Sequence, residues 1–236
     1  MIILPNSELI ITDVEFDCFY PILFYDVDLI QDIEFRNIKS YKSSLLILQN
    51  STYQINHILF YNITSNSSII ESNVQLLIFN SSFELISNYG IFIEQPGDHV
   101  IENTNFSRVE EKSILMDILI STLLNNIFTI SGCLFDSCGN KTDRIVLLRI
   151  PYIVQFVNNI VNNICNTKYG IVIYLNKVDE ITIESCTFIN NNMITEHPSV
   201  YYSGGCGLWI SRTDNNLIIF YKLKINYINC KWINNS

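Results

Sequence analysis

The chain contains no alanine, and glycine and proline are scarce, at 8 and 5 of 236 residues. Alanine is the strongest helix former, whereas the many Ile, Phe and Tyr residues favour strands. The dipeptides Asn-Gly and Asp-Gly, which form the tightest hairpin turns, are absent. We therefore expect strands that are not joined by short hairpins, with a β-sandwich as the less favoured alternative.

Long apolar runs and clusters of positive charge are also missing. The best apolar run, "SILMDILISTLL" at 113–124, is shorter than the ~18 residues of a membrane-spanning helix and contains Asp117. The 14 Lys and Arg residues are scattered among 23 Asp and Glu residues, and the net charge is −9. A phosphate-binding groove needs clustered basic residues, so no nucleic-acid partner and no membrane span are expected. The first residues, "MIILPNSELI", show neither the basic region nor the cleavage site of a signal peptide.

A short motif recurs along the chain, usually at intervals in the twenties. It consists of an aromatic residue, a small or branched residue two positions earlier, and polar residues, often Asn, after it. The aromatic positions are Phe16, Phe35, Phe60, Phe83, Phe106, Phe135, Phe188 and Trp232, and Val161 takes this position in one further copy. Such a period is typical of solenoids, in which each unit buries its apolar face against its neighbours.

Each unit contains candidate strands. In "ITIESCTF", Ile181 and Ile183 alternate with Thr182 and Glu184, which is the period of a half-buried strand. Another apolar segment precedes several of the aromatic residues, at 45–48, 90–93, 146–150, 170–173 and 207–210. The pattern predicts an all-β solenoid of stacked coils. Only 108–124, "RVEEKSILMDILISTLL", could instead form a helix, and an extra strand is the alternative there.

Three segments carry a resemblance to a known family. "GGCGLWI" at 204–210 resembles the "GGA-I" element, and "FINN" from Phe188 and "WINN" from Trp232 resemble the "F-x-x-N" element, of polymorphic-membrane-protein-type repeats in the pectin-lyase-like superfamily. Phe106 and Phe135 depart from the pattern, because no Asn follows three residues later. The resemblance implies a right-handed parallel β-helix of about eight or nine coils. We expect one domain over residues 9–236, and we expect it to be a piece of a longer protein because the chain ends inside a repeat.

The cysteines and asparagines of the motif have an architectural explanation. Seven cysteines occur without the paired spacing of a zinc site, and Cys133, Cys186 and Cys230 stand two residues before the aromatic position. We expect buried thiols that act as compact apolar groups, with one or two disulfides as the alternative. The asparagines are expected to adopt left-handed backbone and to bond to the coils above and below.

The sequence offers little for catalysis. His57, His99 and His197 are expected on loops or outward strand positions, and no "HExxH" motif is present. The resemblance implies an alternative, a polysaccharide lyase or glycoside hydrolase, in which clustered Asp residues act with Lys or Arg. The triplets "NTD", "GHG" and "RIK" that would support hydrolase chemistry are absent. We therefore expect a non-catalytic structural or adhesion module without a required cofactor, with a carbohydrate or a cell-surface protein as its partner.

One acidic patch is a candidate ion site. Aligning Phe16 with Phe35 places the carboxylates of two coils side by side on the outward face, and the candidate ligands are Asp13, Glu15, Asp17, Asp32 and Glu34. Like charges one coil apart repel, and a calcium ion could relieve this because it takes 6–8 oxygen ligands. The alternative is a solvated acidic surface without a metal.

Glycosylation sequons suggest the compartment. The seven N-x-S/T sequons begin at Asn50, Asn62, Asn66, Asn80, Asn105, Asn140 and Asn234. This is more than the roughly four that the composition would give by chance, so we expect an extracellular or cell-surface location.

Overall fold

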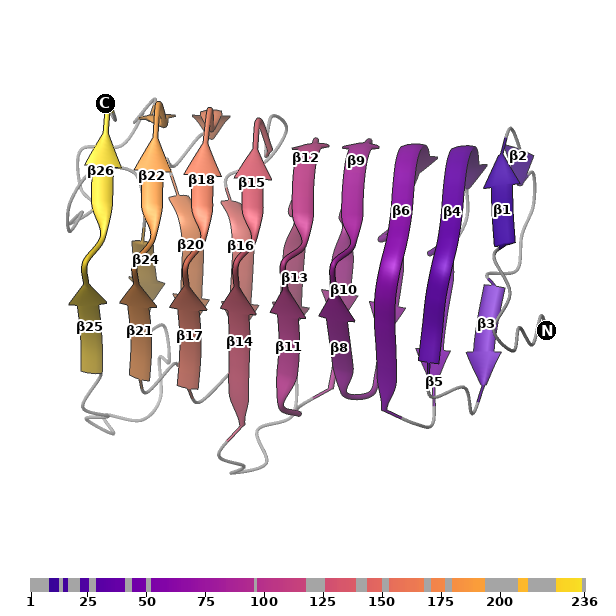
Figure 1. Ribbon diagram of the computed structural model, residues 1–236, viewed down its shortest axis with the longest axis horizontal. Coiled ribbons are helices and arrows are strands. Elements are labelled where there is room, and N and C mark those ends of the chain that lie inside the picture. The colour runs from indigo at the N-terminus through magenta and orange to yellow at the C-terminus, as the bar shows by residue number, and fades with distance from the viewer. Residues whose placement is uncertain are drawn as a thin grey trace.

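The structure is a computed structural model, and the residues that it describes consist of strands and connecting turns, without a helix. It describes residues 9–12, 15–16, 22–25, 29–40, 44–49, 52–95, 97–117, 126–138, 144–149, 153–167, 171–176, 180–193, 208–211 and 224–234. Two long sheets run along the molecule, and their strands lie perpendicular to its longest axis (Figure 1). The N- and C-terminal strands therefore lie at opposite ends of the stack.

The larger sheet, sheet A, has 16 strands arranged in two rows. One row holds β8 (Leu76–Phe79), β11 (His99–Glu102), β14 (Ile127–Ser131), β17 (Ile153–Val157), β21 (Glu180–Glu184) and β25 (Lys224–Ile228). The other row, which contains the aromatic positions, holds β1 (Leu9–Thr12), β2 (Glu15–Phe16), β9 (Ser82–Ile86), β12 (Asn105–Val109), β15 (Leu134–Asp136), β18 (Ile160–Asn162), β22 (Thr187–Ile189) and β26 (Lys231–Ile233). The long strands β4 (Leu29–Ser40) and β6 (Tyr53–Ser65) pass through both rows.

The second sheet, sheet B, has 8 strands and covers the other side of the core. Its strands are β3 (Ile22–Tyr25), β5 (Leu46–Gln49), β7 (Ile70–Ser72), β10 (Ile91–Ile93), β13 (Ile114–Asp117), β16 (Arg144–Arg149), β20 (Ile171–Asn176) and β24 (Leu208–Ser211). A small third sheet pairs β19 (Cys165–Thr167) with β23 (Asn192–Met193). Every strand pair in the described part of the chain is parallel, which is the arrangement of a β-solenoid.

The repeat seen in the sequence is the repeat of the coils. Phe35, Phe60, Phe83, Phe106 and Phe135 lie opposite one another in successive strands and are buried. Their rings stack with centroids 5.1, 4.9, 5.0 and 5.1 Å apart, close to the spacing between strands. This aromatic ladder fills the interior of the stack, as the sequence predicts.

Two residues of left-handed backbone flank the aromatic position in each coil. Three residues before it, φ is +49° to +62° at Asp32, His57, Asn80, Asn103, Gly132, Asn158, Ser185 and Asn229. Two residues after it, φ is +50° to +56° at Asn37, Asn62, Leu85, Arg108, Ser137, Asn163, Asn190 and Asn234. Asn tolerates this conformation best after glycine, which explains its recurrence. The Asn expected three residues after the aromatic position lies one residue beyond this turn, so the turns after Phe106 and Phe135 keep the same geometry without it, at Arg108 and Ser137.

Asparagine amides connect the coils, as expected. Asn62 Nδ2 donates to Asn37 Oδ1 at 2.7 Å, and Asn80 Nδ2 donates to Asn56 Oδ1 at 3.0 Å. Inside the core, Asn159 is fully buried two residues before Val161, in the position that Cys133 occupies one coil earlier. Amide side chains therefore bond to one another at the surface and to backbone groups within the stack.

The fold class is confirmed as an all-β parallel β-solenoid, but the expectation of eight or nine coils is not. Side chains are described in both sheets for about five coils, from β4 and β5 to β14 and β16. The expected number of coils was obtained by counting one aromatic position per coil. These aromatic residues lie only in sheet A, so their number does not establish that sheet B continues over the same coils. The segment 108–124, for which a helix was one alternative, begins with β12 and contains β13, and 118–125 lies outside the described residues.

Candidate functional site

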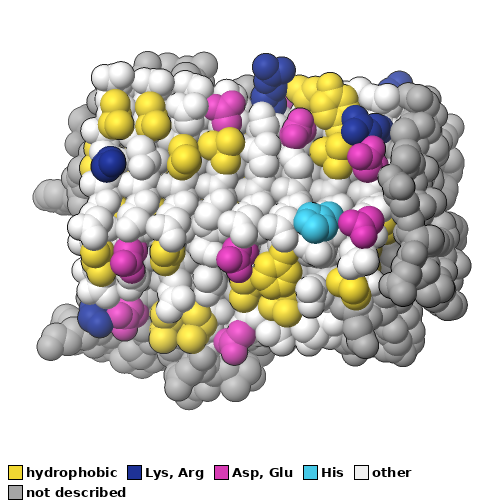
Figure 2. All heavy atoms as spheres, in the orientation of Figure 1, with side chains coloured by type: hydrophobic (Ala, Val, Ile, Leu, Met, Phe, Trp, Pro, Cys, Tyr) yellow, Lys and Arg dark blue, Asp and Glu magenta, His cyan; other side chains and the backbone are white. Residues whose placement is uncertain are grey.

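The outward face of sheet A carries the candidate site. The residues three positions before the aromatic position, from Asp32 to Asn229, are all exposed, and we call them the crease row because they lie where the two strand rows of sheet A meet. Figure 2 shows this face, on which uncharged polar side chains and backbone predominate across the middle. The left-handed backbone of these residues explains their exposure, because it interrupts the alternation of inward and outward side chains.

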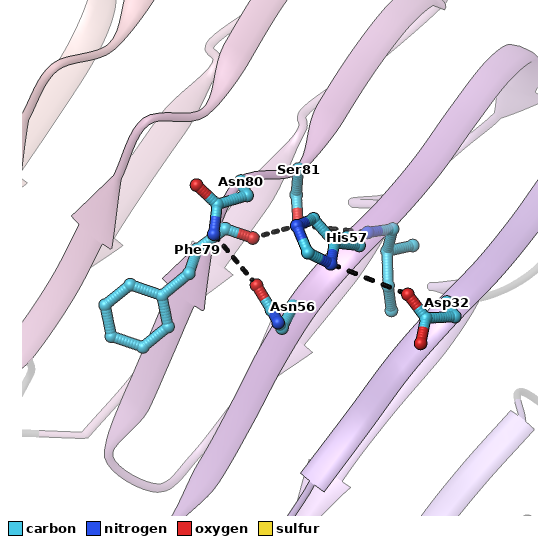
Figure 3. Close-up of polar contacts among 7 residues, drawn as sticks. Asp32, Asn56, His57, Phe79, Asn80 and Ser81 are labelled. Carbon is cyan, nitrogen blue, oxygen red and sulfur yellow. Dashed lines mark hydrogen bonds and ion pairs between the residues drawn. The ribbon is translucent and has the colours of Figure 1, made fainter. Parts of the chain in front are cut away.

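The first residues of the crease row contact one another. His57 Nδ1 lies 3.5 Å from Asp32 Oδ1, and Figure 3 shows the ring pointing toward that carboxylate. Their side chains are 59% and 52% exposed, so this pair contributes little to stability. Beneath the row, Ser81 Oγ donates to the Phe79 carbonyl at 2.8 Å and accepts the Ile58 N–H at 3.2 Å. The crease row therefore presents polar side chains to solvent, and hydrogen bonds to backbone groups connect it to neighbouring coils.

A charged group lies beside the row in the early coils. Arg36 Nε donates to Glu34 Oε2 at 2.8 Å, and its guanidinium lies 5.6 Å from the centre of the Tyr61 ring. The hydrogen bond to Glu34 is the main cause that raises the pKa of Arg36. Two coils further on, Ser82 Oγ donates to Glu84 Oε1 at 2.7 Å. Both carboxylates are engaged by neighbouring side chains, and the face presents hydrogen-bonding groups rather than isolated charges.

The predicted acidic patch is only partly described. Asp13 and Asp17 lie outside the described residues, and Glu15 is described by its backbone alone. Its strand places Glu15 opposite Lys39, and Ile10 lies opposite Glu34. The expected alignment of Phe16 with Phe35 is therefore wrong, because Ile11 pairs with Phe35.

The physical reason for the wrong register is that two alignments place apolar residues opposite apolar residues. Val14 and Phe16 fit the positions opposite Ile33 and Phe35 as well as Leu9 and Ile11 do. Of the other two candidate ligands, Asp32 contacts His57 and Glu34 contacts Arg36. Within the described part of the chain, no group of three or more His, Cys, Asp or Glu side chains could hold a metal ion.

His99 corrects another expectation. We expected an outward or loop position, but His99 is fully buried, in line with the inward residues Leu76 and Phe128 of neighbouring coils. Its Nδ1 accepts the Leu76 N–H at 3.1 Å and its Nε2 donates to the Gln95 carbonyl at 3.0 Å. Burial lowers the pKa of His99 to about 4. The imidazole is therefore a neutral structural group, while His57 is exposed as expected and His197 lies outside the described residues.

The four cysteines whose side chains the structure describes are free thiols, as expected. Cys133, Cys138 and Cys186 are buried, and Cys230 is partly exposed. Burial raises the pKa of the Cys133 thiol to about 12 and the pKa values of Cys138 and Cys186 to about 11. Thiolate is the form that attacks and binds metals, so these three side chains are suited to packing rather than to chemistry.

Sequence reasoning missed the interior amides. Asn159 Oδ1 accepts the Cys133 N–H at 2.8 Å, and Asn191 Oδ1 accepts the Ile164 N–H at 3.0 Å. Alignment of the repeats could have identified both as buried. Asn159 aligns with the inward residue Cys133, and Asn191 aligns with Ile63 and Ile86, which are apolar and buried.

The parallel coils and the polar outward face define a β-solenoid, and the sequence comparison identifies its family. The family model for the right-handed β-helix region matches residues 43–220, and the chain belongs to this family. A comparison with curated proteins and another with solved structures give no match. In the part of the chain that the structure describes, no helix has the length and apolar character needed to cross a membrane.

Proposed function

We propose that the protein is a non-catalytic β-helical module of a surface or secreted protein, and that the outward face of sheet A contacts glycans. The observation that carries the proposal is the crease row, which is exposed in every described coil and contains mainly amide and hydroxyl side chains. Successive members are about one strand spacing apart, ~4.8 Å, along the stack. A row of donors and acceptors at regular spacing suits an extended polar chain that lies along the axis.

The neighbouring side chains support a carbohydrate in particular. Phe79 is half-buried on this face and lies opposite Asn56 of the neighbouring strand, whose amide binds that of Asn80, and Tyr61 in the other strand row is half-buried as well. Sugars present both hydroxyl groups and apolar C–H faces, so aromatic rings next to amides match them. An extended glycan would therefore find both types of contact within two neighbouring coils.

Three glutamates on this face are bound by neighbouring side chains, and this favours glycan binding over the lyase or hydrolase alternative. Glu34 is bound to Arg36, Glu84 to Ser82, and Glu180 to Lys224 at 2.7 Å. Lys224 is the main cause that lowers the pKa of Glu180. A general acid in glycoside cleavage needs a raised pKa, which is the opposite shift.

The proposal also includes the type of repeat that forms the coils. We propose that the coils are polymorphic-membrane-protein-type repeats, in which the aromatic and the following Asn are both structural. In "FINN", Phe188 is in the ladder position and Asn191 Nδ2 donates to the Val161 carbonyl at 3.1 Å. The glycines of "GGCGLWI" lie outside the described residues, and Leu208–Ser211 forms β24.

A surface or secreted location is supported by the exposure of several sequons. Asn62, Asn66, Asn80 and Asn234 are exposed. Expression in a secreting eukaryotic cell, followed by treatment with a glycan-removing amidase, should reduce the apparent mass. An unchanged mass would count against this location.

Glycan binding is best tested with substitutions that leave the backbone undisturbed. Glycine adopts left-handed backbone freely, so Asn80→Gly, Asn103→Gly and Asn158→Gly together remove three crease-row amides without strain. The matched control is Asn62→Gly with Asn190→Gly, which removes amides from the other left-handed row. Bacterially produced protein, free of its own glycans, would be applied to an array of polysaccharides.

We expect the unmodified chain to bind a subset of extended polysaccharides, the triple variant to bind at least about tenfold more weakly, and the control to bind normally. Melting curves establish that all variants are folded. Absence of binding to any polysaccharide would overturn the proposal, and release of new reducing ends during incubation would favour the enzyme.

A further inference from the structure

A second row of residues runs beside the crease row on the outward face of sheet A. Each member lies one position before a residue of the crease row, and we call these residues the flanking row. The strand register places them in one line: Gln31, Asn56, Phe79, Glu102, Ser131, Val157 and Glu184. All of them are half-buried. The two rows together form one continuous band along the axis of the stack.

The charge of this band has one sign. We consider the crease row, the flanking row and the outward residues directly before the aromatic position, from β4 to β22, all of which the structure describes. These positions contain no lysine or arginine. They contain four carboxylates, those of Asp32, Glu34, Glu102 and Glu184. Figure 2 agrees, because the basic side chains lie toward the margins of this face. Such a band attracts cationic ligands and repels anionic ones.

Two of the four carboxylates are available to a ligand. Asp32 and Glu34 already contact neighbouring side chains. Among the described residues, no side chain bonds to the carboxylate of Glu102 or of Glu184. The flanking row places these two residues three strand spacings apart, which is about 14 Å along the axis. One extended ligand can therefore reach both carboxylates.

The surroundings of Glu102 combine three kinds of contact. Phe79 lies opposite Glu102 in the neighbouring strand, and its half-buried ring offers an apolar surface. Asn80 and Asn103 follow these two residues in the crease row and are exposed. An aromatic ring suits the C–H face of a sugar, and amides suit its hydroxyl groups. A carboxylate adds a strong, charge-assisted hydrogen bond to an ammonium group. An amino sugar presents all three matching groups.

We propose that the glycan bound by this band is a polysaccharide of amino sugars with free, protonated amino groups, and that Glu102 and Glu184 bind two of these groups. The inference rests on the proposed function, because it names the class of glycan that the outward face of sheet A contacts. A neutral glycan would leave both carboxylates without a partner. A polyuronate would place its own carboxylates beside them, and like charges repel.

The test compares three probes by isothermal titration calorimetry in a mildly acidic buffer at low and high salt. They are an oligomer of glucosamine, the same oligomer fully N-acetylated, and an oligomer of galacturonate. N-acetylation removes the positive charge but keeps the sugar backbone. We expect the glucosamine oligomer to bind most tightly and to weaken as salt increases. The N-acetylated oligomer should bind more weakly and independently of salt, and the galacturonate oligomer should bind least.

Substitutions assign the charge preference to the two glutamates. Glu102→Gln with Glu184→Gln should weaken binding of the glucosamine oligomer at least about fivefold and leave binding of the N-acetylated oligomer unchanged. The matched control is Glu71→Gln with Glu111→Gln, which removes the same number of charges outside the strands of sheet A. This control should bind all three probes as the unmodified chain does. Melting curves of both variants check that they are folded.

The outcomes separate this inference from the proposed function. Equal binding of the glucosamine and N-acetylated oligomers would overturn the inference and leave glycan binding standing. A preference for the galacturonate oligomer, or equal losses in the two double variants, would overturn the inference as well. If none of the three probes binds, the inference is overturned, and the polysaccharide array decides separately whether the proposed function holds.

Discussion

The imidazole of His99 accepts the backbone N–H of Leu76 at 3.1 Å, inside the core and one coil away. A proton on Nδ1 would place a charge in a buried site, which is why the pKa of His99 falls to about 4 from its ordinary 6.5, and it would also remove the acceptor of the Leu76 N–H. The folded chain thus binds this proton less readily than the unfolded chain. His99 therefore stabilises the fold fully above pH 6.5 and progressively loses this contribution as the pH falls toward 4.

This linkage predicts acid sensitivity. Between pH 6.5 and 4 we expect the free energy of unfolding to decrease by up to ~3 kcal/mol because of His99 alone. Urea unfolding across this range would measure it. His99→Leu, which places the residue of the preceding coil at this position, should be less stable at pH 7 but should lack that part of the pH dependence. An equal pH dependence in both proteins would contradict the assignment.

The buried amide of Asn159 should be difficult to replace. Its Oδ1 accepts the Cys133 N–H at 2.8 Å and its Nδ2 donates to the Ile130 carbonyl at 2.9 Å. Asn159→Ile introduces a residue that earlier coils hold at this position but leaves both backbone groups unpaired. We expect a loss of about 1–3 kcal/mol in urea unfolding. The exposed neighbour provides the control, because Asn158→Gly should change stability by no more than about 0.5 kcal/mol.

Two glycines offer a matched pair of substitutions. A Cβ at Gly90 would lie 2.6 Å from the backbone oxygen of Ser113, which accepts the Ile91 N–H and cannot move freely. At Gly97 the nearest atom would be 3.4 Å away, at the end of the His99 side chain. We expect Gly90→Ala to cost about 1–3 kcal/mol and Gly97→Ala to cost less than about 0.5 kcal/mol, measured by thermal and urea unfolding. Equal effects would show that the coils can separate locally to accept a methyl group.

Melting curves in calcium and in chelator test whether Asp13, Glu15, Asp17, Asp32 and Glu34 bind calcium or form a solvated acidic surface. We expect the second outcome, with equal melting temperatures, because Glu34 is bound by Arg36 and the backbone of Glu15 lies opposite Lys39. A bound ion would raise the melting temperature by mass action. A higher value in calcium that is abolished by Asp32→Asn with Glu34→Gln would establish the site.

The sequence by itself determined the repeat and most of its inward positions. Parallel pairing stacks equivalent residues of successive coils about 4.8 Å apart, so Phe60, Phe83 and Phe106 must form one row whatever the loops do. The same stacking places Cys133 and Cys186 in the inward row two residues before the aromatic position, so both are buried thiols. Asparagine marked many of the left-handed positions, since its side chain tolerates that backbone.

Only the tertiary structure decided the positions at which the local pattern allows more than one arrangement. Leu85 and Arg108 adopt left-handed backbone against their own preference, because the coils on either side hold them there. His99 is buried because its strand continues an inward row seven residues before the aromatic, beyond the reach of the motif. The alternation of apolar residues did not determine the register of the N-terminal strand. Either Leu9 and Ile11 or Val14 and Phe16 could lie opposite Ile33 and Phe35 at similar free energy, and the packing of the whole stack selects the first.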